Sequence, residues 1–174
     1  MRQNYEIKAR IFNLDVARWK ALSYIKKFEN KHHDIQNQKD IYFKIKGRRL
    51  KLRLINKDYG NLILYDRDEK QVRRISEYLI AFVTNPKELE KMMRSLFKVL
   101  IVIEKKREIF LAENIRIHID KIKGLGNFIE FEVIFNTLKS AKKTMNELIE
   151  YFGLVEEEFI KCSYSDLLLK KKGK

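Results

Sequence analysis

The sequence has little of what stabilises or exports many small proteins: one cysteine, one proline, six glycines and no long apolar segment. The single cysteine, Cys162, excludes an internal disulfide bond and is typical of a reducing compartment. The longest purely apolar run, residues 99–103, is far too short to span a bilayer, and no signal-peptide run opens the sequence. We therefore expect a cytoplasmic protein with no membrane partner.

Acidic residues are also scarce relative to basic ones. The 174 residues contain 24 Asp and Glu against 38 Lys and Arg, a formal net charge of +14. A surplus of this size favours polyanionic partners. The length suits one domain, which we expect over residues 1–169, followed by a solvated basic tail at residues 170–174.

Alternation of apolar and polar residues predicts strands along most of the chain. The predicted strands are residues 4–11, 50–54, 62–67, 75–83, 101–107, 115–120 and 129–135. Residues 40–46 and 108–111 are also expected to be extended, whereas the polar stretch 29–39 is predicted to be a loop. The turn signals between strands are short, which favours antiparallel hairpins over parallel crossovers.

Helices are predicted in the gaps between these strands. Asn85 followed by Pro86 is a typical helix start. We expect Asp15, Ser140 and Ser165 to cap three more helices, the second of which stops at Gly153. The first helix is expected to pack through one apolar face, made of Val16, Trp19, Leu22, Ile25 and Phe28.

Each predicted strand has one charged face and one apolar face, because alternate residues of a strand share a face. A solvated sheet face would explain any single strand. However, carboxylates gather in the first and last strands and cations in the middle ones. A long sheet must also protect its edges, which closure achieves. We therefore predict a closed antiparallel β-barrel with helices outside and a charged bore.

A bore of this kind suits a triphosphate group. Lys and Arg neutralise its charge, and Arg binds phosphate oxygens bidentately. Carboxylates beside an anion need a bridging hard cation, and Mg²⁺ accepts a few carboxylate oxygens while it keeps sites for phosphate and water. The two sets of charges together predict a metal–triphosphate site.

A series of short motifs runs through the sequence in a fixed order. They are Asn4-Tyr5-Glu6-Ile7-Lys8, Gln38-Lys39-Asp40-Ile41-Tyr42-Phe43, Leu50-Lys51-Leu52-Arg53, Tyr65-Asp66-Arg67, Ser76-Glu77-Tyr78, Lys105-Lys106-Arg107, Arg116-Ile117-His118-Ile119-Asp120, Gly124-Leu125-Gly126-Asn127-Phe128-Ile129-Glu130-Phe131-Glu132 and Ser163-Tyr164-Ser165-Asp166-Leu167-Leu168. The series resembles the CYTH superfamily, the triphosphate tunnel metalloenzymes, and within it the class IV adenylate cyclase-like members. The resemblance implies an α+β fold, a closed eight-stranded antiparallel β-barrel with helices packed around the outside.

The resemblance also implies roles for residues at matching positions. Mg²⁺ or Mn²⁺ would be held by Glu6, Glu130, Glu132 and Asp120. The triphosphate would be bound by Lys8, Lys51, Arg53, Arg67, Lys105, Arg107 and Arg116, of which Lys8, Lys105 and Arg116 would be catalytic. Asn4 departs from the family, whose first motif begins with Glu; an amide oxygen can ligate Mg²⁺ but brings no charge. His118 is expected to be a hydrogen-bonding wall residue.

The sequence leaves three functions open. The favoured one is a class IV-like adenylate cyclase, which converts ATP to cyclic AMP and pyrophosphate. A triphosphatase acting on tripolyphosphate, thiamine triphosphate or a nucleoside triphosphate shares the same motifs. A non-catalytic module that binds triphosphates or RNA 5′ ends is the third; because no RRM or KH signature is present, we expect nucleic acid to be an unlikely partner. A homodimer is expected by resemblance only.

Overall fold

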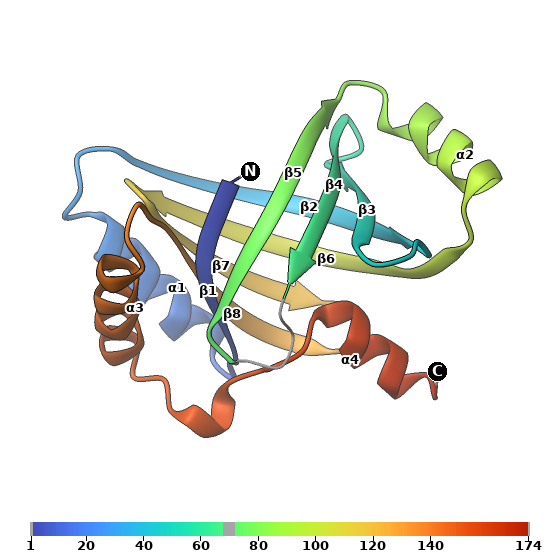
Figure 1. The fold of residues 1–174 in the computed structure, drawn as a ribbon. Coiled ribbons are helices and arrows are strands. Elements are labelled where there is room, and N and C mark those ends of the chain that lie inside the picture. The colour runs from blue at the N-terminus through green and yellow to red at the C-terminus, as the bar shows by residue number, and fades with distance from the viewer. Residues whose placement is uncertain (1, 68–71, 174) are drawn as a thin grey trace.

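The computed structural model describes residues 2–67 and 72–173. Within them, eight strands and four α-helices follow one another (Figure 1). The strands are β1 (Arg2–Arg10), β2 (Lys31–Phe43), β3 (Arg49–Ile55), β4 (Tyr59–Arg67), β5 (Arg74–Val83), β6 (Val99–Ala112), β7 (Ile115–Ile122) and β8 (Gly126–Ile134). The helices are α1 (Leu14–Ile25), α2 (Pro86–Leu96), α3 (Leu138–Phe152) and α4 (Tyr164–Lys171), with a short 3₁₀ turn at Glu156–Glu158.

The strands form one closed barrel in the order β1-β5-β4-β3-β2-β6-β7-β8, and all neighbouring pairs are antiparallel. Strand β1 closes the barrel because it pairs with β5 on one side and with β8 on the other. Closure leaves no continuous sheet edge open to solvent. The predicted fold, a closed eight-stranded antiparallel barrel with helices around it, is confirmed.

Most strands turn an apolar face outward, and helices cover part of that outer surface. Helices α1 and α3 lie side by side on one flank (Figure 1). There Ala21 of α1 and Met145 of α3 belong to one buried cluster with Ile7, Ile117 and Phe131 of the barrel wall. On the other flank, α2 packs against β3. The core therefore lies between barrel and helices, which frees the barrel interior for polar side chains.

Strand β2 corrects the sequence prediction most clearly. Residues 29–39 were expected to be a loop, but the strand begins at Lys31 and pairs with β6 from Lys31 to Phe43. Gln36 and Gln38 line the barrel interior, so the inward face of this segment is polar. Because its outward face is mostly polar too, the usual alternation signal is missing. The segments at 101–107 and 108–111 are likewise one strand, β6.

Three helix starts also differ from prediction. Helix α1 is capped by Asn13, whose side-chain oxygen accepts the N–H groups of Asp15 and Val16 at 3.1 Å. The caps of α3 and α4 are Thr137 and Ser163 rather than Ser140 and Ser165. The predicted start at Asn85 and stop at Gly153 are confirmed, and Gly153 adopts a left-handed φ of 67°.

The predicted apolar face of α1 is partly wrong. Trp19 is 66% exposed and Val16 is 47% exposed. The helix buries Ala17, Ala21 and Tyr24 together with the predicted Ile25, and the two alanines let it approach the barrel closely. Among the described residues, no helix is long and apolar enough to cross a bilayer.

Candidate active site

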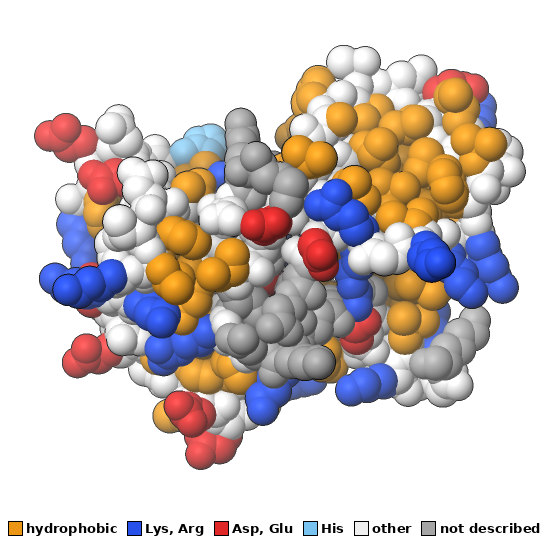
Figure 2. Space-filling view, in the orientation of Figure 1, with side chains coloured by type: hydrophobic (Ala, Val, Ile, Leu, Met, Phe, Trp, Pro, Cys, Tyr) orange, Lys and Arg blue, Asp and Glu red, His pale blue; other side chains and the backbone are white. Residues whose placement is uncertain are grey.

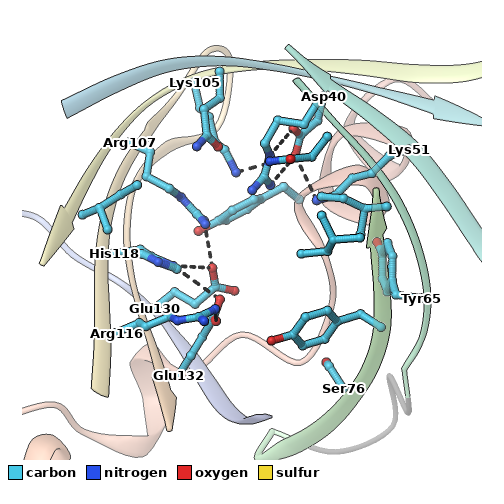
Figure 3. Close-up of a pocket in the computed structure, with 18 of the residues that line it drawn as sticks. Asp40, Lys51, Tyr65, Ser76, Lys105, Arg107, Arg116, His118, Glu130 and Glu132 are labelled. Carbon is cyan, nitrogen blue, oxygen red and sulfur yellow. Dashed lines mark hydrogen bonds and ion pairs between the residues drawn. The ribbon is translucent and has the colours of Figure 1, made fainter. Parts of the chain in front are cut away.

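A cavity of about 380 Å³ occupies the barrel interior. Side chains from all eight strands line it, together with Ser163 and Tyr164 at the start of α4. Figure 3 shows His118, Glu130 and Glu132 on one side, opposite Tyr65 and Ser76. The side of the cavity with His118 and the two glutamates therefore differs chemically from the side with Tyr65 and Ser76.

An acidic group lies on β8 and its two neighbouring strands. Ligand-type atoms of His118, Glu130 and Glu132 all lie within 4.8 Å of one another. Glu6 is directly opposite Glu132 in the β1–β8 register, and both line the cavity. This clustering follows from alternation and register: inward residues on adjacent antiparallel strands must face the same space.

Cations surround this acidic group and set its charge state. The Lys8 ammonium lies 2.9 Å from Glu130, and Arg116 lies 3.5 Å from Glu132. Burial alone would raise the pKa of Glu130, but Lys8, His118 and Arg107 hold that pKa well below the ordinary value. The carboxylate is therefore ionised at neutral pH.

His118 is governed by burial in the same way. Its pKa is lowered, first because burial disfavours the charged imidazole and then because Arg107 is near. Its Nδ1 lies 3.4 Å from Glu132 and 3.5 Å from Glu130. A neutral imidazole between two carboxylates can donate one hydrogen bond, or offer a nitrogen to a metal ion.

A second ionic cluster centres on Asp40 of β2, which is almost completely buried. Arg53 donates to both of its oxygens, at 2.7 and 2.8 Å, and the ammonium of Lys51 lies 3.0 Å away. Lys105 approaches the same carboxylate at 3.7 Å. Burial would raise the pKa of Asp40, yet Arg53, Lys51 and Lys105 hold it well below the ordinary value. Three cations are thus kept together by one internal anion.

The pKa values of both lysines of this cluster are lowered. Burial, with Arg53 nearby, lowers the pKa of Lys51 to about 8. Burial also lowers the pKa of Lys105 well below its ordinary value, and Arg107 and Arg53 act in the same direction. An anion entering the cavity would favour the charged form of both lysines.

Arg107 links the two clusters. It donates to Asp120 at 2.7 and 2.5 Å and to Glu130 at 2.8 Å. The hydroxyl of Tyr164, at the start of α4, donates to Asp120 at 2.8 Å. The carboxylate of Asp120 is therefore occupied by two donors from different elements, and it fixes the guanidinium of Arg107 toward the acidic group.

The described side chains that β4 and β5 contribute to the cavity are uncharged. They belong to Tyr59, Asn61, Ile63, Tyr65, Ser76, Tyr78 and Ile80. This wall faces the acidic group across the cavity, whereas Lys51 of the Asp40 cluster lies next to Tyr65 (Figure 3). A ligand that fills the space would meet charge on one side and aromatic or aliphatic surface on the other.

Most of the residues predicted from the sequence line this one cavity. They are Glu6, Lys8, Lys51, Arg53, Lys105, Arg107, Arg116, Glu130 and Glu132. Asp120 was grouped with the metal ligands, but it lies outside the group formed by His118, Glu130 and Glu132. Arg67 ends β4, and its side chain falls outside the described part of the structure.

The sequence predicted no role in the site for Asp40, and for His118 only that of a hydrogen-bonding wall residue. Asp40 had been noted only as part of a motif, although its alternation with Tyr42 and Gln38 indicated an inward position. His118 was expected to be a wall residue, but its ring lies within the acidic group. Its alternation with Arg116 and Asp120 placed it inward, and only the register with Glu130 places it among carboxylates.

The acidic group fits a divalent metal ion. Carboxylate oxygens suit Mg²⁺ and Mn²⁺, and an imidazole nitrogen is compatible with transition metals. The side-chain oxygen of Asn4 is buried beside it and accepts no hydrogen bond from a described residue, while its nitrogen donates to Glu132 at 2.9 Å. An unsatisfied buried oxygen needs a partner, and a hard cation held by Glu130 and Glu132 would supply one.

Replacing Asn4 by glutamate is expected to strengthen metal binding. A carboxylate would add negative charge beside Glu132, which destabilises the metal-free protein but attracts the ion. We expect Asn4→Glu to lower the melting temperature without metal and to enlarge the rise produced by Mn²⁺. Thermal unfolding with and without Mn²⁺ measures both effects. Asn61→Glu places the same charge on the opposite wall, and an equal gain there would contradict the assignment.

Comparison with known proteins agrees with this geometry. The CYTH domain family matches residues 2–164. A Methanocaldococcus jannaschii protein named as a putative adenylate cyclase is 27% identical over 173 residues, covering 93% of this chain and 96% of that protein. The structure of the PH1012 protein from Pyrococcus horikoshii superposes with a TM-score of 0.80 at 23% identity, covering 94% of this chain and 98% of that one.

A third similar structure comes from Vibrio parahaemolyticus and is also named as a putative adenylate cyclase. Its TM-score is 0.73 at 20% identity, with 96% of this chain and 98% of that chain covered. At these identities the two structures establish the barrel fold alone. The family match spans almost the whole chain, including every strand that lines the cavity. The chain therefore belongs to the CYTH domain family.

Proposed function

We propose that this protein is a metal-dependent enzyme that acts on an organic triphosphate inside the barrel, and that its reaction converts ATP to cyclic AMP and pyrophosphate. The observation that carries the proposal is the coexistence of two charge clusters in one cavity. Glu130 and Glu132 are gathered at one side, and Lys51, Arg53 and Lys105 at the other. A pure anion binder has little use for the carboxylates.

The cationic cluster suits the phosphate chain. Lys51, Arg53 and Lys105 share one carboxylate, so their combined charge is only partly neutralised. A phosphate group entering the cavity can take hydrogen bonds from the same three side chains. Asp40 would thus hold the cations in place until the substrate arrives.

The described side chains of the β4–β5 wall favour an organic substrate over inorganic tripolyphosphate. Ile63, Tyr65, Tyr78 and Ile80 give this wall aliphatic and aromatic surface. Tripolyphosphate is charged along its whole length and gains nothing from such contacts, whereas a nucleoside can bury its base and sugar there. This asymmetry, with the cyclase-like motifs, supports ATP.

The chemistry would be shared among residues of the chain as follows. In the cyclase reaction, the ribose 3′ hydroxyl attacks the α-phosphorus and pyrophosphate leaves. Lys8, Lys105 and Arg116 are assigned to the charge that develops on phosphate oxygens. Glu6, Glu130 and Glu132 would hold the metal ion, which when bound supplies Lewis-acid polarisation of those oxygens. Positioning by the cavity decides which oxygen attacks.

A product assay tests the proposal. The protein is incubated with ATP, thiamine triphosphate or tripolyphosphate, each with Mg²⁺ and with Mn²⁺. Cyclic AMP and pyrophosphate are the expected products from ATP. Orthophosphate release would instead identify a triphosphatase, in which water attacks the γ-phosphorus. Binding of a triphosphate without turnover under every condition would overturn the enzymatic assignment.

The affinity for triphosphate is expected to fall as the pH rises above 8. Lys51 has a pKa of about 8 because burial disfavours its charge, so it loses its proton above that pH and no longer attracts phosphate. Isothermal titration of the protein with tripolyphosphate from pH 6.5 to 9.5 measures the effect. Lys51→Arg keeps the charge throughout. Equal pH dependence in both proteins would contradict the role of Lys51.

A further inference from the structure

A second cavity, of about 600 Å³, lies on the outer face of the barrel. Residues of β2, β6 and β7 form it, together with Lys57 after β3 and Gly124 after β7. Lys105 contributes to its wall, but its ammonium is directed toward Asp40 in the interior. Five other lysines also line it: Lys39, Lys57, Lys106, Lys121 and Lys123. We call this outer cavity the lysine groove.

The strand register places two lysines of the groove face to face. Lys106 of β6 is directly opposite Lys121 of β7. Like charges at directly opposed positions of an antiparallel pair are destabilising. Both side chains are exposed, and neither forms an ion pair with any described residue. Lys106 and Lys121 thus form a cationic pair without an anionic partner among the described residues, and this pair does not stabilise the fold.

The other groove lysines are only partly neutralised. Lys39 pairs with Glu90 of α2 at 3.0 Å, and Lys123 pairs with Glu104 at 2.7 Å. Among the residues that the structure describes, Glu104 is the single acidic one that lines the groove. At its rim, Lys171 of α4 donates to the carbonyl oxygen of Gly124 at 2.8 Å. Part of the basic tail predicted from the sequence is therefore helical and anchored beside the groove.

We propose that the lysine groove binds the sugar–phosphate backbone of a single-stranded nucleic acid without reading its sequence. Lysine ammonium groups bind phosphates as point charges. Neither arginine nor an aromatic ring lines the groove among the described residues, so it offers no bidentate base contact and no stacking platform. Because the groove would contact only the phosphate charges, its binding does not require an RRM or KH motif.

The aliphatic surface of the groove favours a nucleic acid strand, in which sugars lie between the phosphates. Leu54 and Ile122 are buried in the wall beneath the groove, and the stems of the groove lysines provide aliphatic surface above them. Sugars can contact such surface, whereas an inorganic polyphosphate chain has nothing to place against it. The nucleic acid strand is therefore the occupant that the groove fits better.

The groove and the tunnel are separate sites on opposite faces of the same strands. Along β6, Lys105 and Arg107 point inward, whereas Lys106 between them points outward. The inference therefore does not depend on the function proposed for the tunnel. A strand that carries a 5′ hydroxyl, without a triphosphate, tests the groove alone.

Fluorescence anisotropy with labelled 20-nucleotide RNA and DNA strands of two unrelated sequences measures the binding. We expect similar affinities for both sequences and a slope of log K against log [KCl] of roughly −3, as for four or five phosphate contacts. Lys106→Glu/Lys121→Glu should weaken binding at least about tenfold at 50 mM KCl and bring the slope to roughly −1.5. Its melting temperature and its triphosphate turnover should not fall.

The matched control is Lys139→Glu/Lys142→Glu. These lysines lie on α3, both are exposed, and their replacement changes the net charge by the same amount. If the control loses as much affinity as the groove variant, the binding reflects the overall charge, and the groove assignment is wrong. Unchanged binding by the groove variant would also overturn it. So would tight binding of unlabelled polyphosphate by a protein that binds neither RNA nor DNA.

Discussion

Replacement of Glu132 by alanine is expected to lower the turnover of the triphosphate substrate by roughly 10³-fold, equivalent to about 4 kcal/mol of transition-state stabilisation. Glu132 lies within 4.8 Å of His118 and Glu130 and is opposite Glu6 in the β1–β8 register. The substitution removes one of the few carboxylates that would bind the proposed metal ion. Steady-state rates with Mg²⁺ and with Mn²⁺ measure the loss.

The loss should affect metal binding as well as rate. In Glu132→Ala, the rise in melting temperature caused by Mn²⁺ should shrink together with turnover. Glu147→Ala removes an exposed carboxylate from α3 and should change neither quantity. Glu130→Ala is expected to behave like Glu132→Ala, although it also leaves Lys8 and Arg107 with fewer partners. Wild-type rates in both variants would show that the metal assignment is wrong.

The barrel could be predicted from the sequence because most of its strands have one apolar face. Ile7 and Phe131 alternate with Glu6, Lys8 and Glu130, and this period of two determines which side chains turn inward. Once the sheet closes, the inward charged residues must meet. Local alternation therefore indicated which charged residues turn inward, whereas their roles were implied by the resemblance to the CYTH superfamily.

Features that depend on contacts between strands could not be predicted in this way. Residues 31–37 pair with β6 although both of their faces are mostly polar, so no local signal marks them as a strand. Asp40 could be placed inward, but its contacts with Lys51, Arg53 and Lys105 come from two neighbouring strands, β3 and β6. The unneutralised pair of Lys106 and Lys121 likewise exists only because of the β6–β7 register.

The interior of this barrel poses a stability problem that its carboxylates solve. Lys8, Lys105 and Arg107 are all nearly inaccessible to solvent. Buried cations cost free energy unless they are paired and hydrogen-bonded. Glu130 pairs with Lys8, whereas Asp40 of β2 pairs with Lys105 and Asp120 of β7 pairs with Arg107. The groups that stabilise the free protein therefore also hold the cations in position for an anion.

Asp120→Asn is consequently expected to lower the free energy of unfolding by about 3–5 kcal/mol, the usual cost of removing one partner from a buried ion pair. Asp120 is completely buried, and it accepts hydrogen bonds from Arg107 and from Tyr164 of α4. The amide would keep the shape of the side chain but leave Arg107 with Glu130 as its acidic partner. Urea denaturation at pH 7 measures the difference.

The difference between wild type and Asp120→Asn should depend on pH in a defined direction. Burial would raise the pKa of Asp120, but Arg107 and Lys105 lower it, so its ionised form is stabilised by folding. That contribution is present above the pKa of an unfolded aspartate, about 3.9, and is lost as the pH falls further. The two proteins should therefore converge in stability at acidic pH. Glu104→Gln removes a carboxylate from an exposed pair with Lys123 and should leave stability nearly unchanged. If Asp120→Asn were equally harmless, Arg107 would not need its internal anion, and the cations of the tunnel would be held by some other means.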